Sequence, residues 1–316
     1  MIKIENLVKD YGSFRALNGL SMEIHKGEVL GLLGPNGAGK TTTLRIITGY
    51  LRPTSGRVTV GGRDITEQPL PVKQLIGYLP ESAPLYREML VYDYLVHTAA
   101  VRGLSGQAGR DRIGHLADLC GLREVMHKPV SALSKGYRQR TGLAAALMSD
   151  PEILILDEPT SGLDPNQISG IRRIIREIGR TKTVIFSTHI LSEAEAVCDR
   201  VVIINRGRIA ADGSAEMLKT RTGGTETLRL VLTGGTGEEY RRVLSELDGV
   251  LTVRTGDAAE DNDQTALAVE TSGDRRKEIY LALRDRDWIL LEMIRQKKSL
   301  EHIFRELTGE TDHEQE

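Results

Sequence analysis

The segment that most constrains this chain is the glycine-rich run Gly34–Thr41, whose letters GPNGAGKT fit the pattern G-x-x-x-x-G-K-[ST]. It follows an apolar run, Val29–Leu33, that predicts a buried strand, and it leads into a helical pattern at Thr42–Thr48. Glycines let the backbone wrap closely around a phosphate, and the start of a helix adds a favourable dipole. A simple turn between strand and helix is the alternative, but the full pattern with both flanks favours a phosphate-binding loop.

Two residue types in this loop have distinct uses for a bound phosphate. The ammonium of Lys40 reaches the β- and γ-phosphates, and the hydroxyl of Thr41 ligates Mg²⁺. The predicted nucleotide contacts are Gly34, Pro35, Asn36, Gly37, Ala38, Gly39, Lys40, Thr41 and Thr42.

A second signal is an apolar run that ends in two acids. Ile153–Leu156 predicts a buried strand, and Asp157 and Glu158 follow it directly. Charge at the carboxyl end of a buried strand indicates a nearby cation or reacting group. We therefore predict that Asp157 serves Mg²⁺, directly or through another ligand, and that Glu158 is the general base toward the γ-phosphate. A helix cap or a solvated strand end is the alternative for either acid alone.

Short β-branched runs alternate with longer helical patterns, which predicts an α/β first domain over residues 1–219 with a partly parallel sheet. Thr183–Ser187 and Val201–Ile204 are two further buried strands. Residues 90–146 carry Leu, Val and Ala at helical spacing, which predicts an inserted helical subdomain. Small and polar residues at 220–226 predict a linker to a second domain.

Residues 227–308 predict a small α+β domain. Its predicted elements are strand Leu228–Leu232, helix Glu238–Leu247, strands Leu251–Arg254 and Ala266–Glu270, helix Arg275–Arg284 and strand Trp288–Ile294. This βαββαβ order is that of the ferredoxin-like split motif. A last helix, Ser299–Leu307, and a polar tail at 309–316 follow. No cluster in this domain indicates a catalytic site, and dimerisation, ligand sensing and capping all stay open as its role.

Composition excludes several classes of protein. The 42 Lys and Arg against 44 Asp and Glu give a formal net charge of −2, which supplies no field for general nucleic-acid or anionic-lipid binding. Cys120 and Cys198, the two cysteines, are too few for a disulfide framework or a cysteine-rich metal site. No apolar run approaches the roughly 18 residues of a membrane span, and the N-terminus does not resemble a secretion signal. We expect a cytoplasmic location.

In their order along the chain, these motifs resemble those of the ATP-binding subunits of ABC transporters, over essentially all of residues 1–215. The most specific segment is Leu133–Arg140 (LSKGYRQR), which resembles the family signature LSGGQ. In the family this loop faces the γ-phosphate of ATP held by a second subunit, so the resemblance implies that Ser134 and Gly136 contact ATP in a head-to-tail dimer. Lys135 and Tyr137 depart from the commonest signature and indicate a subclass.

The resemblance implies roles for four further residues. Asp164 matches the loop that crosses the dimer interface, and His189 matches the switch histidine at the γ-phosphate. Tyr11 matches the aromatic residue that stacks on adenine, with a strand-end core residue as the alternative. Glu81 stands where many members have a Gln that ligates Mg²⁺. A carboxylate can keep that metal role, while an ordinary loop acid is the alternative.

The fold that the resemblance implies is a P-loop nucleotide-binding domain with a RecA-like core, a β-subdomain and the helical subdomain. The implied function is ATP hydrolysis with Mg²⁺, coupled to a separate polytopic membrane permease. The implied partners are a second copy of the chain and the permease, without nucleic acid, at the inner face of the cell membrane. The predicted catalytic residues are Lys40, Glu158 and His189. The predicted metal ligands are Thr41, Glu81 and Asp157.

Several segments together resemble the type-2 export class, which includes gliding-motility-type and multidrug or copper-processing ATPases. They are the signature, the run Gly77–Leu95 and the last helix. One alternative is a soluble ABC ATPase acting on ribosomes or DNA, whose usual second cassette or long coiled-coil insertion is missing from this sequence. A regulator that only binds nucleotide is the other, and the intact set of catalytic residues argues against it.

Overall fold

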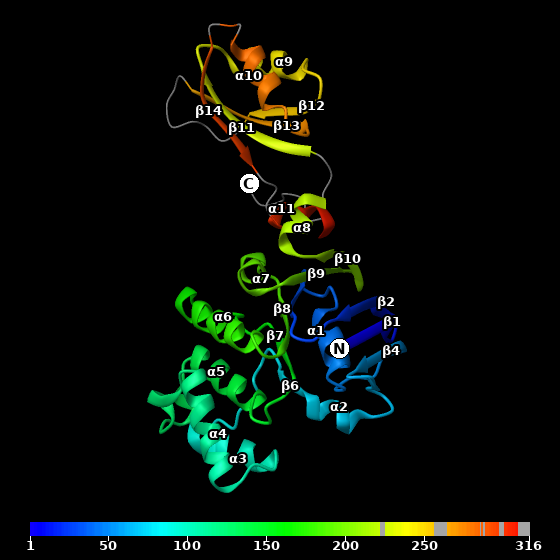
Figure 1. Ribbon diagram of the computed structural model, residues 1–316, viewed down its shortest axis with the longest axis vertical. Helices are drawn as coiled ribbons and strands as arrows, with labels where there is room; N and C mark the ends of the chain where they lie inside the picture. Colours follow the sequence, from blue (N-terminus) through cyan, green and yellow to red (C-terminus); the bar gives the residue numbers. More distant parts are fainter. Residues whose placement is uncertain (222–224, 256–263, 285, 287, 297–299, 309–316) are drawn as a thin grey trace. The chain divides into compact units, whose positions relative to one another are not determined.

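The computed structural model describes residues 1–221, 225–255, 264–284, 286, 288–296 and 300–308. The chain divides into two compact units, and the division falls between Ala215 and Glu216 (Figure 1). Helix α8 (Ala215–Arg221) contains the predicted boundary at residue 219. The linker predicted at 220–226 was too long, because α8 ends at Arg221 and strand β11 begins at Thr225, while 222–224 lie outside the described residues.

The strands and helices of the first unit follow the predicted alternation. Its strands are β1 (Ile2–Tyr11), β2 (Phe14–Ile24), β3 (Val29–Leu33), β4 (Ser55–Val60), β5 (Arg63–Asp64), β6 (Ile76–Leu79), β7 (Ile153–Asp157), β8 (Thr183–Thr188), β9 (Arg200–Asn205) and β10 (Arg208–Gly213). Its α-helices up to the boundary are α1 (Lys40–Ile47), α2 (Pro69–Leu75), α3 (Val91–Val101), α4 (Gly106–Leu119), α5 (Lys135–Ala146), α6 (Pro165–Gly179) and α7 (Leu191–Val197).

The central sheet has the strand order β10-β9-β3-β8-β7-β6. The strands from β9 to β6 are parallel, and β10 is antiparallel to β9. In this register Leu33 lies opposite Thr188, and Asp157 lies opposite Ser187. The loops that follow β3, β7 and β8 therefore start at one edge of the sheet, which is the edge where open α/β sheets bind ligands.

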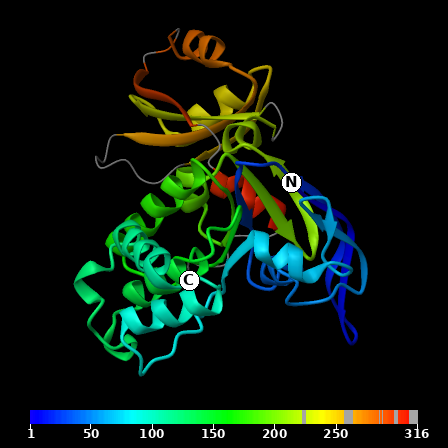
Figure 2. The ribbon, with the colours of Figure 1, turned by 60° about the horizontal axis from the view of Figure 1, so that its bottom comes forward.

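Two hydrophobic clusters hold this unit together. In one cluster, Ile4 of the antiparallel sheet β2-β1-β4-β5 and Leu44 of α1 pack with Leu32 of the central sheet. In the other, Leu154 of β7 packs with helical residues such as Ile174. Burial of each such side chain contributes about 1.5–3 kcal/mol. Leu44 thus holds helix α1, which directly follows the glycine-rich loop, in the first of these clusters. Figure 2 shows the helices of residues 90–146, in cyan to green, and the antiparallel strands β1 and β2, in blue, on opposite sides of this unit.

Helix α6 shows how local sequence sets an element next to the site. Asp164 caps its N-terminus by accepting a hydrogen bond from the N–H of Gln167, and Pro165 occupies the first turn. Four isoleucines then recur at helical spacing and are buried: Ile171, Ile174, Ile175 and Ile178. The helical subdomain predicted at 90–146 is present as α3, α4 and α5, which contribute to the same cluster.

The second unit has its own core and sheet. Its elements from the first strand on are β11 (Thr225–Thr233), α9 (Gly237–Ser245), β12 (Val250–Thr255), β13 (Thr265–Ser272), α10 (Arg276–Arg284), β14 (Ile289–Gln296) and α11 (Leu300–Thr308). The predicted βαββαβ order is present, and the antiparallel sheet order β12-β13-β11-β14 places β13 between the two strands that α9 joins. Ser299 and the tail predicted at 309–316 lie outside the described residues.

None of the helices within the described ranges combines the length and the apolar character that crossing a membrane requires.

Candidate active site

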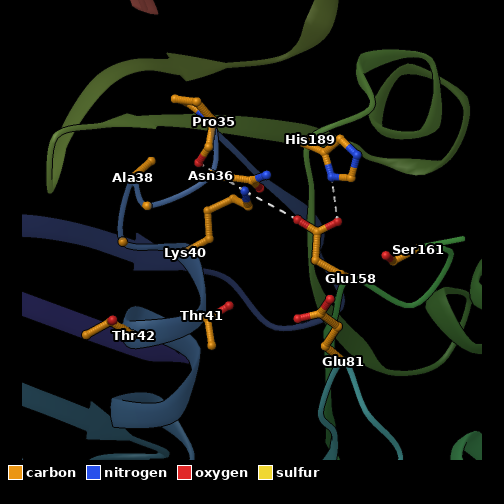
Figure 3. A pocket seen from close by; sticks show the side chains of 12 residues that line it. Pro35, Asn36, Ala38, Lys40, Thr41, Thr42, Glu81, Glu158, Ser161 and His189 are labelled. Atoms are coloured by element: carbon orange, nitrogen blue, oxygen red, sulfur yellow. Dashed lines mark hydrogen bonds and ion pairs between the residues drawn. The ribbon is translucent and has the colours of Figure 1, made fainter.

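A pocket lies where the loops after β3, β7 and β8 meet. Its lining residues are Pro35, Asn36, Gly37, Ala38, Gly39, Lys40, Thr41, Thr42, Glu81, Glu158, Ser161 and His189. Figure 3 shows Glu158 between Lys40 and His189, with Glu81 below it on the same side of the pocket. The structure therefore brings most of the predicted loop residues together with the three other predicted residues Glu81, Glu158 and His189, and with Ser161.

The phosphate-binding loop is closely packed against the sheet. A Cβ at Gly34 would lie 2.3 Å from the carbonyl oxygen of Ile204, so only glycine fits there. Gly39 has φ 110° before α1, in the region that favours glycine. Lys40 is 5% exposed, and its Nζ donates to the carbonyl oxygens of Gly34 at 2.6 Å and Pro35 at 3.3 Å. The ammonium is thereby fixed inside the loop that would surround a phosphate.

Glu158 is held by two partners on opposite sides of its carboxylate. Its Oε1 lies 3.3 Å from Nζ of Lys40, and its Oε2 lies 2.8 Å from Nδ1 of His189. The side chain is nearly buried, and the backbone has φ 47°, a conformation rare for residues other than glycine. Such strained backbone is found preferentially at functional sites.

Asp157 is 1% exposed at the end of β7. Its Oδ1 accepts hydrogen bonds from Thr41 Oγ1 at 3.0 Å and from Ser187 Oγ at 2.7 Å. Its Oδ2 is buried and has no hydrogen-bond partner within the part of the chain that the structure describes. An unpaired buried carboxylate oxygen next to a threonine hydroxyl suits a hard cation such as Mg²⁺.

The charge of Asp157 also affects the pKa of Tyr78, on β6. Burial, together with the charge of Asp157, raises the pKa of Tyr78 on β6 to about 12, so this phenol stays neutral.

Among the described residues there is no cluster of three or more His, Cys, Asp or Glu that could hold a metal ion. A cation here would need phosphate or water ligands besides Thr41 and Asp157, which is usual for Mg²⁺.

Two contributors were missed by the sequence analysis. Ser187, at the end of β8, donates to Asp157 and accepts a hydrogen bond of 2.9 Å from the N–H of Glu158. A hydroxyl residue directly after the apolar run Val184–Phe186 was the available signal. Ser161 lines the pocket and lies in the same SGLD run as the predicted Asp164.

The predicted signature residues lie elsewhere. Ser134 and Gly136 line a second pocket, which shares no residue with the first. Its other lining residues are Tyr137, Arg140, Asn166 and Gln167. Ser134 caps α5, its Oγ accepting from the N–H of Tyr137, and Asp164 caps α6 beside it. Two adjoining helix N-termini and an arginine make this second pocket suitable for an anion.

Tyr11 also lies outside the first pocket. It ends β1 and is 46% exposed as a residue, and Nζ of Lys9 lies 5.3 Å from the ring centroid. An exposed ring is available for stacking rather than fixed in the core.

Two family models match parts of this chain. A family model described as "ABC transporter" matches residues 17–161. A second model, described as "AAA domain, putative AbiEii toxin, Type IV TA system", matches residues 129–194. Both matches fall inside the first unit.

Two curated relatives match nearly the whole chain. The linearmycin resistance ATP-binding protein LnrL of Bacillus subtilis (strain 168) is 32% identical over 320 residues, which cover 98% of this chain and 99% of LnrL. The daunorubicin/doxorubicin resistance ATP-binding protein DrrA of Streptomyces peucetius is 35% identical, with coverage of 98% and 92%. Both matches therefore include the second unit.

Among solved structures, the dimeric bacterial ABC transporter cassette MJ0796 superimposes with a TM-score of 0.63 at 25% identity. The match covers 68% of this chain and 98% of that cassette. It agrees with the extent of the first unit.

Proposed function

Because this chain belongs to the ATP-binding subunits of ABC transporters and is the ATP-hydrolysing component of such a transporter, we propose that two copies bind ATP between them. Each ATP would contact the phosphate-binding loop of one copy and the signature residues Ser134 and Gly136 of the other. The relatives, named for drug resistance, are consistent with the type-2 export class. None of the comparisons supports action on ribosomes or DNA.

The observation that carries this proposal is the separation of the two anion-binding pockets. Lys40, Glu158 and His189 line one, and the helix N-terminus at Ser134 lies at another, in the same compact unit. One copy therefore offers a nucleotide only half of the predicted contacts. In a head-to-tail pair, each copy would supply its signature contacts to the nucleotide bound at the loop of the other copy. MJ0796 was solved as a dimer.

Within each site we assign Glu158 as the base that accepts a proton from the attacking water. His189, 2.8 Å from this carboxylate, would fix its orientation and contact the γ-phosphate. Lys40 offsets the negative charge of the phosphates, which is the main electrostatic contribution expected in phosphoryl transfer. Tyr11 would stack on the adenine ring.

The residues present fit Mg²⁺. Thr41 Oγ1 and the unpaired Oδ2 of Asp157 are oxygen ligands of the kind it prefers, and Glu81 lines the same pocket. The ion would offset charge on the phosphate oxygens when bound. Ser187 donates to the same Oδ1 of Asp157 as Thr41 does and helps to hold the carboxylate in place.

For partners and location, we propose a polytopic permease and the inner face of the cell membrane. ABC ATP-binding subunits work with membrane permeases and dimerise. Purification of the tagged chain from its native membranes in mild detergent, followed by mass spectrometry, tests this. A stoichiometric polytopic protein is expected, and recovery of ribosomal proteins instead would contradict it.

Mixed dimers test the shared site directly. Lys40→Met disables the phosphate-binding loop, and Gly136→Glu places a carboxylate in the signature pocket, where it repels phosphate. Each variant alone should lose nearly all ATPase activity. In a mixed dimer, one of the two sites combines an intact loop with an intact signature, so mixing the variants should restore a substantial part of the activity.

Failure of mixing to restore any activity, in mixed dimers verified by differential tags, would show that the two motifs act within one chain. Glu158→Gln provides a second readout, because loss of the base should leave an ATP-bound dimer that gel filtration detects. Glu152→Gln, on an exposed residue just before β7, is the matched control and should hydrolyse ATP like the wild type.

A further inference from the structure

A buried carboxylate outside the pocket is not used by the chemistry described above. Glu193 lies in α7 and is 1% exposed. No lysine, arginine or histidine pairs with it among the described residues, and its Oε1 has no hydrogen-bond partner there. Burying an acid without a neighbouring cation costs folding free energy. The hydrogen bonds that the carboxylate does make therefore indicate its role.

Both retained contacts are to threonine hydroxyls, through one oxygen. Glu193 Oε2 accepts from Thr160 Oγ1 at 2.7 Å and from Thr188 Oγ1 at 2.8 Å. Thr160 belongs to the loop after β7, and Thr188 ends β8. The carboxylate therefore links two loops that are separate in sequence and adjacent at the edge of the central sheet.

Each threonine lies within two residues of a member of the proposed catalytic pair. Thr188 directly precedes His189, and its Oγ1 also accepts a hydrogen bond of 3.0 Å from the N–H of Ile190. The backbone on both sides of the histidine is thus tied to the carboxylate through one hydroxyl. Since a carboxylate only accepts hydrogen bonds, Thr188 must donate to it and keeps its lone pairs for Ile190.

The other threonine follows Glu158 by two residues. Its turn is closed by the N–H of Ser161, which donates to the carbonyl oxygen of Glu158 at 3.1 Å. The carbonyl oxygen of Thr160 accepts from the N–H of Leu163 at 3.2 Å, in the run that leads to Asp164. Movement of the backbone between Thr160 and Asp164 would therefore displace the Thr160 hydroxyl that donates to Glu193.

We propose that Glu193 is a positioning residue that sets the distance between Glu158 and His189 by tying together the two loops that carry them. This inference rests on the proposed function, because it assumes that this pair organises the attacking water. It further implies that the segment approaching the second copy at Asp164 and the histidine are mechanically connected within one chain. ATP binding depends on the phosphate-binding loop, which Glu193 does not contact, and should be spared.

The test separates turnover from binding. Glu193→Leu keeps the approximate volume and removes both hydrogen bonds, so kcat should fall by about 10- to 100-fold, since small displacements of reacting groups have effects of that size. The KM for ATP should change by less than about twofold, because the binding contacts are untouched. In Glu193→Gln the amide oxygen can still accept from both threonines, so most of the lost kcat should return.

Thr160→Val removes one of the two hydrogen bonds to Glu193, and Thr188→Val removes the other together with the hydrogen bond from the N–H of Ile190. Both variants provide the measurement if Glu193→Leu fails to fold. Each should lower kcat with the KM for ATP retained. Ser192→Ala, an exposed position on the same helix, is the control and should behave as the wild type.

Folded Glu193→Leu or threonine variants with wild-type kcat would overturn the inference, as would a Glu193→Gln variant as impaired as Glu193→Leu. Equal losses of kcat and ATP affinity would also overturn it, since they indicate general damage. Glu158→Gln in the same assay separates the two proposals. If it still hydrolyses ATP at the wild-type rate, the proposed function fails, whereas an inactive Glu158→Gln beside an active Glu193→Leu rejects the role of Glu193 alone.

Discussion

Ser187 Oγ donates a hydrogen bond of 2.7 Å to Oδ1 of Asp157. The same hydroxyl accepts a hydrogen bond from the N–H of Glu158, so one buried side chain fixes the acid proposed for Mg²⁺ and the backbone of the proposed base. Because all three residues are buried, loss of the hydroxyl leaves the N–H of Glu158 without its partner and leaves Oδ1 of Asp157 with the hydrogen bond from Thr41 alone.

Ser187→Ala should therefore lower both stability and turnover. The free energy of unfolding should fall by about 1–3 kcal/mol, the usual cost of a buried unsatisfied group. Turnover should fall because both acids lose a restraint, while Ser187→Thr keeps the hydroxyl and should recover part of the activity. Urea denaturation and steady-state ATPase assays measure the two effects, and an unchanged kcat in a destabilised variant would confine the role of Ser187 to folding.

His189→Ala should abolish most ATP hydrolysis without abolishing ATP binding. The histidine lies 2.8 Å from Oε2 of Glu158 and lines the pocket, whereas most of the predicted phosphate contacts come from the loop Gly34–Thr41, which the substitution leaves intact. Loss of a group that orients the base should lower kcat by about 10²- to 10⁴-fold. Binding of a fluorescent ATP analogue, beside an ATPase assay, provides the measurement.

His115→Ala is the matched control for this variant, because His115 is an exposed histidine on α4 of the same unit. It should show wild-type hydrolysis. An active His189→Ala enzyme would contradict the assignment of this histidine to the chemistry.

Gly34→Ala should damage the phosphate-binding loop more than Gly37→Ala. The added Cβ at position 34 would lie 2.3 Å from the carbonyl oxygen of Ile204, which belongs to β9 and cannot easily move. A Cβ at position 37 meets no atom within 4 Å, and only the φ of 78° disfavours it, at a cost of about 1–2 kcal/mol. Isothermal titration with ATP and thermal unfolding should both rank Gly34→Ala as the more severe change.

Asp64 should make the stability of the first unit depend on pH at the acidic end. Burial alone would raise the pKa of this carboxyl, but hydrogen bonds from Arg57 and from the N–H groups of Thr66 and Glu67 outweigh it and hold the pKa below its usual value of 3.8. A carboxyl with a lowered pKa in the folded state stabilises the protein above the unfolded pKa, and this stabilisation is lost as the pH falls through the folded value.

Asp64→Asn should accordingly lower the free energy of unfolding by about 1 kcal/mol at pH 7, and the difference from wild type should shrink below about pH 4. Urea denaturation at both pH values measures it. Glu124→Gln, at an exposed position, should show no such pH-dependent difference. A deficit that stays constant into acid would mean that charge on Asp64 is not its source.

Much of the fold was predictable because the signals are local. The glycine pattern between an apolar run and a helical pattern located β3, the loop and α1. The runs that became β7, β8 and β9 were recognisable because strands buried on both faces are continuously apolar. The junction between the units was predicted less well, because small polar residues at 225–226 were assigned to the linker, although they pair with β13 in the folded chain.

The sequence by itself determined that this chain has a phosphate-binding loop, an acid pair after a strand, and a family signature, since each is written in neighbouring residues. Tertiary structure alone decided which of these meet. Parallel pairing of β7 and β8 brings Glu158 to His189 and Ser187 to Asp157, and Thr160 and Thr188 to Glu193. The fold also leaves Ser134 in a pocket separate from the one that Glu158 and His189 line. Spacing along the chain does not encode these contacts, because register and helix packing set them only when the core is assembled.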